Sequence, residues 1–239
     1  MTFRNILHGW QGKQVSSFGN LRKERKANNP SIITNGLVVH LDAGDPRSYT
    51  GSGTTWSDLS GNGLDATLTN GPTYSNVNNG TIVLDGVNDY IQLPTSSSLT
   101  MTGDFTFSCW ILLRTNATSP HIWSTPDAQT LQLNLSDIIY YNSTNGNQVF
   151  GSYTTNNWYN IVLSRTGSTM TAFLNGQRKF SNTYSVTHNF SGIGIGYRSI
   201  SPTGYYWPGN LPNVNVYNRG LSSSEVMQNF NAMRVRYGV

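Results

Sequence analysis

Charged residues are scarce in this sequence, and glutamate is almost absent. Only 11% of the 239 residues are charged, against about 25% in an ordinary soluble domain, and the glutamates are Glu24 and Glu225. Helical proteins are rich in Glu, Lys, Ala and Leu, so this scarcity argues against a helix bundle, a coiled coil and most α/β enzymes. The 24 glycines and the aromatic content of 12% favour strands joined by tight turns.

Cysteine and long hydrophobic runs are also missing. A single cysteine, Cys109, excludes an internal disulfide framework. Residues 2–12 lack the apolar run of about 7–15 residues that a signal peptide needs, and no stretch approaches the roughly 18 apolar residues of a membrane span. We therefore expect synthesis in a cytoplasm without signal-directed export. Release from the cell would then require lysis or an assembled particle.

Positive charge is concentrated near the N-terminus. Residues 1–31 hold six basic residues and one glutamate, a net charge of +5, whereas residues 32–239 hold nine basic and ten acidic residues. A polar cluster at 28–31 ends this segment, so we predict a basic arm over 1–31 and a folded domain over 32–239. Such an arm favours an acidic partner, which could be nucleic acid, a membrane or a protein surface, although a solvated leader fits as well. Its basic residues are Arg4, Lys13, Arg22, Lys23, Arg25 and Lys26.

Residues 32–220 show the alternating pattern of half-buried strands. In the run 105–113 every second residue is apolar. Residues 158–180 predict a three-stranded antiparallel meander, because Asn175-Gly176 suits a tight hairpin turn. Short strands at near-regular spacing, separated by glycine and asparagine turns, indicate an all-β sandwich of two sheets.

A short helix is predicted at the C-terminus, over 222–234. Ser222 and Glu225 have the spacing of a capping box, in which each side chain satisfies a backbone N–H of the first turn. An apolar stripe follows, and we expect it to lie on the sandwich as a structural latch. The stripe consists of Val226, Phe230 and Met233.

Seven motifs follow one another in a recognisable order. They are Gly36–Gly44, Trp56–Gly63, Leu84–Ile91, Phe105–Trp110, Trp158–Gly167, Phe173–Gly176 and Val216–Val226. They resemble the concanavalin A-like lectin/glucanase superfamily, in its laminin-G-like, pentraxin-like branch. The resemblance implies a jelly-roll sandwich of two antiparallel sheets, to which the basic arm and the helix are added. The variant is also similar to domains of bacteriophage structural proteins, a narrower match that depends on 41–44 and 228–232.

Sugar binding needs aromatic rings beside polar groups, because the ring packs on the CH-rich face of a sugar while amides and carboxylates hold its hydroxyls. The strongest candidates are Tyr205, Tyr206 and Trp207, which lie in a loop rich in proline and glycine. Tyr140 and Tyr141 come next. Aromatic residues in loops also pack or form protein interfaces, so this alternative stays open.

Aspartates offer two further chemistries. Asp42, Asp58, Asp85 and Asp89 could supply oxygen ligands to calcium, although the same residues could form Asx-turns that fasten loops. Glycoside hydrolysis usually requires two carboxylates about 5–9 Å apart. Glucanases of the superfamily carry theirs, mostly Glu, on one strand. No strand here has such a set, and Asp85 and Asp89 are the nearest acidic pair.

We therefore predict a non-enzymatic virion structural protein, either a phage capsid decoration or a fibre component, that displays a lectin-like sandwich. The arm would anchor it to other virion proteins and to copies of itself in a homo-oligomer, and the sandwich would contact host surface glycans. Nucleic acid is not expected as a partner, because no nucleic-acid-reading motif accompanies the basic cluster. A free carbohydrate-binding lectin is the alternative, and a glycoside hydrolase acting through Asp85 or Asp89 is the second.

Overall fold

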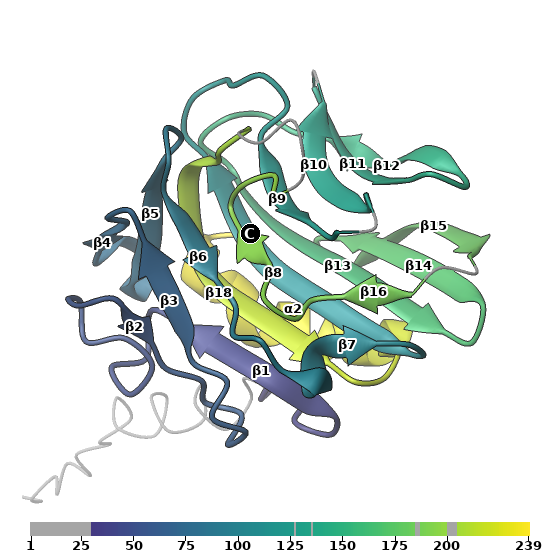
Figure 1. Ribbon diagram of the computed structural model, residues 1–239, viewed down its shortest axis with the longest axis horizontal. Helices are drawn as coiled ribbons and strands as arrows, with labels where there is room; N and C mark the ends of the chain where they lie inside the picture. Colours follow the sequence, from purple (N-terminus) through teal and green to yellow (C-terminus); the bar gives the residue numbers. More distant parts are fainter. Residues whose placement is uncertain (1–29, 127, 135, 185–186, 200–204) are drawn as a thin grey trace, which may run out of the picture. The chain divides into compact units, whose positions relative to one another are not determined.

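Two antiparallel sheets pack face to face in the computed structural model, as a jelly-roll sandwich (Figure 1). The all-β fold and the short C-terminal helix are therefore confirmed. Ser31–Val239 form one compact unit. Residues 1–29 of the arm predicted over 1–31, with all six of its basic residues, lie outside the described residues. The structure describes residues 30–239 except 127, 135, 185–186 and 200–204.

Sheet A contains eight of the described strands, in the spatial order β15, β14, β13, β8, β18, β5 and β4, with β1 also beside β18. The first part of β18 pairs with β5 and its second part with β1. Between these parts, the register of β18 against β8 shifts between Asn210 and Asn213. The strands are β1 (Leu37–Asp42), β4 (Thr73–Ser75), β5 (Thr81–Asp85), β8 (Phe105–Leu113), β13 (Trp158–Thr166), β14 (Thr169–Leu174), β15 (Gln177–Thr183) and β18 (Pro208–Tyr217). The predicted meander over 158–180 is the run β13–β14–β15.

Sheet B also has eight described strands, in the order β12, β11, β10, β9, β17, β6, β3 and β2. They are β2 (Thr55–Trp56), β3 (Ala66–Thr69), β6 (Tyr90–Gln92), β9 (His121–Ser124), β10 (Thr130–Asn134), β11 (Asp137–Asn142), β12 (Gly146–Ser152) and β17 (Gly194–Ile195). A small separate sheet joins β7 (Thr100–Met101) to β16 (His188–Asn189), and short 3-10 turns occur at η1 (Val77–Asn79) and η2 (Ser97–Leu99).

The core fills the space between the two sheets. The alternating run in β8 turns Phe105, Phe107 and Cys109 inward, where all three are fully buried. Rings from both sheets meet there, for example Phe107 and Trp123 with centroids 5.7 Å apart. Burial raises the pKa of the Cys109 thiol, which therefore behaves as a small apolar core residue.

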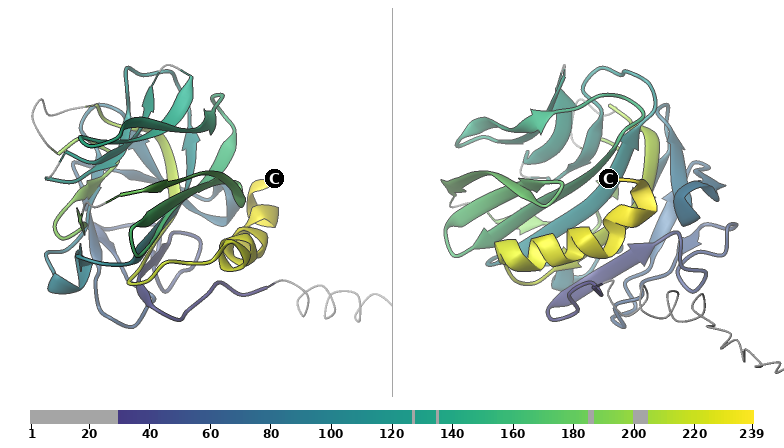
Figure 2. Two further views of the ribbon diagram at one scale, coloured as in Figure 1. Left: turned by 90° about the vertical axis from the view of Figure 1, so that its right-hand side faces the viewer. Right: turned by 180° about the vertical axis from the view of Figure 1, so that it is seen from behind.

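Helix α2 (Ser223–Tyr237) covers the outer face of sheet A (Figure 2). Its capping box forms as predicted, but the helix continues three residues beyond the predicted end and stops at Gly238, which has a left-handed φ of 71°. The ring of Trp110 stacks on Phe230 and on Tyr237, with centroids 5.6 and 4.2 Å apart. Within the described residues, the structure contains no helix of the length and apolarity needed to span a membrane.

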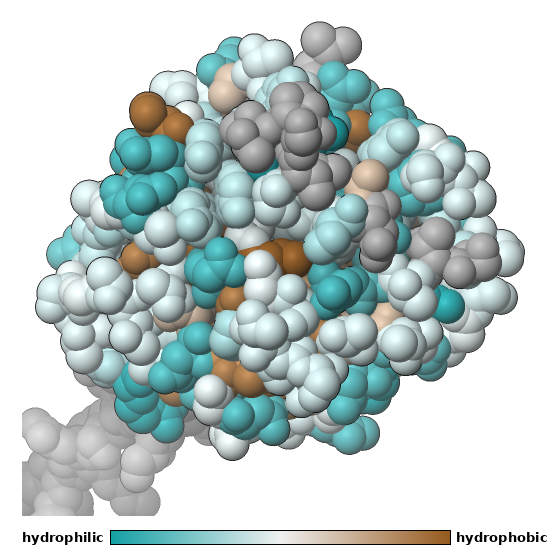
Figure 3. All heavy atoms as spheres, viewed as in Figure 1, coloured by the Kyte–Doolittle hydropathy of each residue, from teal (hydrophilic) through white to brown (hydrophobic). Residues whose placement is uncertain are grey.

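The face turned away from α2 has a different surface. It is mainly hydrophilic, with hydrophobic atoms in small separate patches (Figure 3). Among the described residues, the α-helix is α2, which packs on sheet A, so no described α-helix covers sheet B.

Candidate functional site

Three tyrosines gather on the outer face of sheet B. Tyr90, which begins β6, and Tyr197, which follows β17, have ring centroids 4.5 Å apart. Tyr206, just before β18, stacks on Tyr197 with centroids 5.6 Å apart and ring planes 12° apart. All three side chains are partly exposed. We call these three residues the tyrosine cluster.

The pairing of β6 with β17 fixes the position of the cluster. Ile91 is fully buried in the core, so the neighbouring Tyr90 and Gln92 point to the opposite face of sheet B. Gly194 pairs with Gln92, and a Cβ atom on Gly194 would lie only 1.8 Å from Cε1 of Tyr197. The ring of Tyr197 therefore lies against bare backbone, and only glycine leaves room for it.

The surroundings of the Tyr197 hydroxyl disfavour its ionisation. Burial raises the pKa of Tyr197, and the neighbouring Tyr90 and Tyr206 raise it further. Among the described residues, no protein group forms a hydrogen bond with any of these three hydroxyls. The cluster thus combines apolar ring surface with polar groups that remain available to a ligand.

Tyr205 lies beside the cluster and contacts two basic side chains. Its φ of 55° is left-handed, which is uncommon for an aromatic residue. The guanidinium carbon of Arg198 lies 5.7 Å from its ring centroid, and the His121 ring lies 5.5 Å away. Burial lowers the pKa of His121 to about 4, partly offset by its hydrogen bond to the Ser119 carbonyl. The imidazole is therefore neutral near pH 7.

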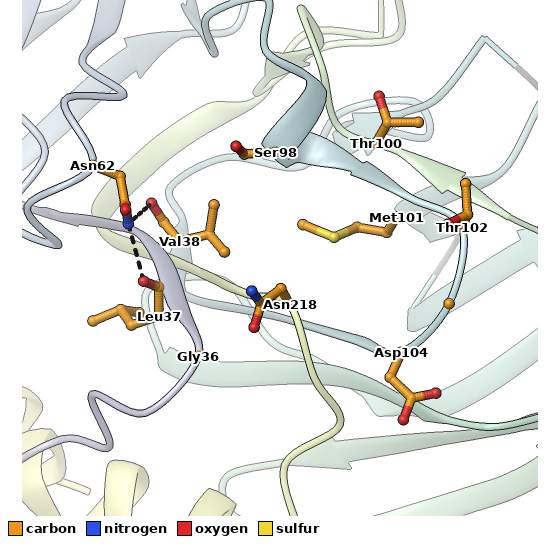
Figure 4. Close-up of a pocket in the computed structure, with 11 residues that line it drawn as sticks. Gly36, Leu37, Val38, Asn62, Ser98, Thr100, Met101, Thr102, Asp104 and Asn218 are labelled. Atoms are coloured by element: carbon orange, nitrogen blue, oxygen red, sulfur yellow. Dashed lines mark hydrogen bonds between the residues drawn. The ribbon is translucent and has the colours of Figure 1, made fainter.

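A separate hollow of about 410 Å³ opens beside the start of β1 (Figure 4). We call it the β1 hollow. Met101 and Asn218 point toward its centre, and Asn62 donates its amide to the carbonyls of Leu37 and Val38, at 3.2 and 3.0 Å. Its described lining contains no aromatic ring. The other residues that line it are Gly36, Ser98, Thr100, Thr102, Gly103 and Asp104.

Burial removes two of the five predicted sugar-binding residues from the surface. Trp207 is fully buried in the core, because its backbone N–H pairs with the Gly196 carbonyl at 2.8 Å and leads the ring between the sheets. Tyr140 is also fully buried, and its hydroxyl is hydrogen-bonded to Nε2 of His188 at 2.8 Å. Tyr205, Tyr206 and Tyr141 keep exposed ring surface.

Asp42 and Asp58 direct their carboxylates into the protein. Asp42 forms an ion pair of 2.6 Å with Arg236 of α2 and accepts the Gly44 N–H. Asp58 accepts the backbone N–H of His40 at 2.8 Å and the hydroxyl of Ser60 at 2.6 Å. Both carboxylates fasten loops, which is the alternative to calcium binding.

Asp85 and Asp89 lie at the turn between β5 and β6. Oδ1 of Asp85 accepts the N–H groups of Val87 and Asn88 at 2.8 and 3.2 Å, and Oδ2 of Asp89 accepts the Asp85 N–H at 3.1 Å. Burial raises the pKa of Asp89; at Asp85 the backbone donors outweigh burial, and the pKa falls. Within the described residues, no group of three His, Cys, Asp or Glu side chains has an arrangement that could hold a metal ion.

The sequence pattern predicts Tyr206 as a sugar-binding residue but gives no such prediction for Tyr90 or Tyr197. Each missed tyrosine lies at one end of an apolar strand run, and the two come together only because β6 and β17 pair. A signal for the pair was present in the glycine at 194, which leaves space on the outer face, but using it required the pairing of the strands.

A family model supports the resemblance found in the sequence. The model of the concanavalin A-like lectin/glucanases superfamily matches residues 85–227, more than half of the chain. The chain belongs to this superfamily. None of the curated proteins matches it.

Solved structures with the same fold are associated with carbohydrates or with binding. A Trypanosoma rangeli sialidase in complex with sialic acid matches with a TM-score of 0.67 and 20% identity, over 86% of this chain and 34% of that one. The binding domain of Paraclostridial mosquitocidal protein 1 matches with a TM-score of 0.65 and 20% identity, over 83% of this chain and 52% of that one. A third match is domain 4 of AbnA, an extracellular GH43 arabinanase from Geobacillus stearothermophilus, in complex with arabinotriose. Its TM-score is 0.63 and its identity 17%, over 81% of this chain and 97% of that one.

These matches establish the fold alone, because all three identities are low. The chain spans about a third of the length of the sialidase it matches. The prediction of a virion structural protein is wrong, since the similar structures are sialidases and an arabinanase domain. They agree better with the alternative prediction, a free carbohydrate-binding lectin.

Proposed function

We propose that the domain binds carbohydrate without hydrolysing it, and that the tyrosine cluster is its binding surface. The observation that carries this proposal is the arrangement of Tyr90, Tyr197 and Tyr206, whose rings and hydroxyls lie together at the surface. Supporting it, the AbnA domain that was solved with arabinotriose has this fold over 97% of its length.

The chemistry of the cluster suits a saccharide. Aromatic ring edges and faces pack on the CH groups of a sugar, and hydroxyls that lack protein partners can exchange hydrogen bonds with sugar hydroxyls. The rings are already held in place by one another and by Gly194, so binding costs little side-chain entropy. The β1 hollow offers hydrogen-bonding groups but no ring, which makes it the weaker candidate.

The test is binding of the full chain to arabinotriose and to sialic acid, measured by calorimetry and extended on a glycan array. We expect Tyr197→Ala to weaken binding by about tenfold or more, since ring stacking is worth about 0.5–1.5 kcal/mol beyond its burial. Tyr141→Ala is the matched control, because Tyr141 is a partly exposed tyrosine of the same sheet. Equal affinity in the two variants, or no glycan bound by the wild type, would refute the proposal.

Glycoside hydrolysis is the second candidate, and the opposite pKa shifts of Asp85 and Asp89 favour it, because a carboxylate pair with separated pKa values can act as base and acid. Against it, the oxygens of Asp85 already cap the turn. Release of reducing sugar from a bound glycan, lost in Asp85→Asn, would support hydrolysis over binding alone.

A further inference from the structure

Arg198 is one of several arginines of the described sandwich that form no ion pair. The ion pairs found among the described residues join Arg47 to Asp45, Arg219 to Glu225, and Arg236 to Asp42. No such pair involves Arg198, and its Nε atom is buried without a hydrogen-bond partner in the described structure. One edge of this guanidinium has therefore lost water without gaining an acceptor.

The rest of the guanidinium is reachable, since Arg198 is only partly buried. Its position is fixed from both sides. The next residue, Ser199, is bonded to Ser124 through its N–H at 2.8 Å and its hydroxyl at 3.0 Å. On the other side the guanidinium carbon lies 5.7 Å from the Tyr205 ring centroid, a cation–π contact.

Among the described residues, no carboxylate forms an ion pair with Arg198. The His121 imidazole packed on Tyr205 is neutral above about pH 4, because burial lowers its pKa. A partly desolvated guanidinium forms stronger hydrogen bonds with an anion than a fully hydrated cation does. An anionic group that docked here would also find the planar donor fork that matches a carboxylate.

Arg198 and Tyr205 adjoin the tyrosine cluster along the chain. Arg198 follows Tyr197 and Tyr205 precedes Tyr206, so each is one residue, or about 3.8 Å between Cα atoms, from a cluster member. That spacing is within the reach of a short oligosaccharide. We infer that the binding surface is specific for acidic glycans, with Arg198 pairing to a carboxylate on a sugar next to the one that packs on the tyrosines. This inference rests on the proposed function.

The experiment uses matched trisaccharides that differ only in whether carbon 6 is a carboxylate or CH₂OH: galacturonate and galactose, glucuronate and glucose, mannuronate and mannose. We expect the full chain to bind at least one acid about tenfold more tightly than its neutral partner, the factor that about 1.4 kcal/mol provides. Arg198→Gln should remove this preference and leave the neutral affinity unchanged. Arg198→Lys should restore only part of it, because a lysine lacks the bidentate fork.

Arg178→Gln is the control, since Arg178 is an exposed arginine on β15 of sheet A; it should leave the preference intact. If no acid binds more tightly than its neutral partner, or if Arg198→Gln weakens both members of a pair equally, the inference is overturned. In that case, if the wild type binds arabinotriose and Tyr197→Ala does not, the proposal of carbohydrate binding is still supported. Displacement of the acid by sodium sulfate at constant ionic strength would show a general anion site and would likewise overturn specificity for a sugar carboxylate.

Discussion

The outer faces of the two sheets both carry aromatic residues, but only one of them is covered. On sheet A, Trp110 and Trp158 are closed over by Phe230 and Tyr237 of α2, and all four side chains are at most 8% exposed. On sheet B the tyrosine cluster keeps part of its ring surface in contact with solvent. The same kind of side chain therefore serves two purposes, depending on whether the chain supplies its own cover.

The polar atoms follow the same division. Beneath α2, the Asn213 amide donates to the Leu41 carbonyl at 2.9 Å, and Asn215 donates to Asn213 at 3.1 Å. On sheet B the hydroxyls of the cluster have no protein partner among the described residues. Buried polar groups need hydrogen-bond partners inside the protein, whereas exposed groups can form hydrogen bonds with water or a ligand. On sheet A these polar groups are therefore satisfied internally, whereas the hydroxyls of the tyrosine cluster on sheet B are not bonded to any described protein group.

The largest expected effect is on the covered face. Trp110→Ala removes the ring that stacks on Phe230 and Tyr237, and should lower the free energy of unfolding by about 3–5 kcal/mol. Tyr206→Ala on the open face should cost less than about 1 kcal/mol, because its ring is already partly exposed. Urea unfolding of both variants measures the difference. A Tyr206→Ala cost equal to that of Trp110→Ala would make the cluster a structural element.

The next effect concerns how α2 is fastened to sheet A. Arg236 of α2 pairs with Asp42 and donates to the carbonyls of Asn78 and Gly80, both at 2.5 Å. Since both charged side chains are less than 20% exposed, Arg236→Met leaves an unpaired, poorly hydrated carboxylate and should cost about 2–4 kcal/mol.

The matched control is Arg47→Met, which breaks the Asp45 pair. Arg47 is 79% exposed, and exposed pairs are worth about 0–1 kcal/mol. Equal urea midpoints for the two variants would mean that α2 is not held by Arg236.

Features with a local pattern could be predicted from the sequence, and the cover of sheet A is one of them. The strand β8 and the Ser222–Glu225 capping box depend on residues that are close in the chain, and both form. The half-buried pattern predicted for 105–113 is wrong, however, because β8 is buried on both faces, with Trp110 covered by α2. The end of α2 was predicted three residues too early, because tertiary contacts of Arg236 and Tyr237 extend the helix.

The open face could be predicted only in part, because its members are distant in the chain. Tyr90 and Tyr197 meet through the pairing of β6 with β17, which no local pattern encodes. Trp207 looked like an exposed loop residue because its neighbours are proline and glycine. It is buried because the loop runs back along Gly196 before entering β18. Composition thus indicated the loop but not the direction of its side chains.

An effect of intermediate size on stability and glycan binding tests whether the tyrosine cluster or the β1 hollow is the binding site. Gly194→Ala places a methyl group where the Tyr197 ring lies. It should cost about 1–3 kcal/mol of stability through overpacking and weaken glycan binding by about tenfold. Gly103→Ala is the control, because a Cβ there meets open space and the residue lines the β1 hollow. If Gly103→Ala loses glycan binding and Gly194→Ala does not, the binding site is the β1 hollow and not the tyrosine cluster.

The smallest effects distinguish the two faces by pH. Glu225 lies in the cap of α2, and its hydrogen bonds with Arg219 lower its pKa to about 2. A lowered carboxyl pKa contributes stability that is present above the unfolded value of about 4.3 and is lost as the pH falls toward 2. Asp89, beside Tyr90, has its pKa raised by burial. Its contribution has the opposite sign, because the folded state binds the proton more tightly and loses stability as the pH rises through the unfolded value of about 3.9.

Unfolding free energies measured at pH 3 and pH 6 should therefore change in opposite directions in two variants. Glu225→Gln should reduce the gain in stability between pH 3 and pH 6, by about 1 kcal/mol after screening by solvent. Asp89→Asn should increase that gain, because it removes a carboxylate whose charge burial disfavours, while its amide oxygen can still accept the Asp85 N–H. Changes of the same sign in both variants would show that the turn beside the tyrosine cluster stabilises the charged form of Asp89, as the helix cap does for Glu225. The two faces would then not differ in how they treat their carboxylates.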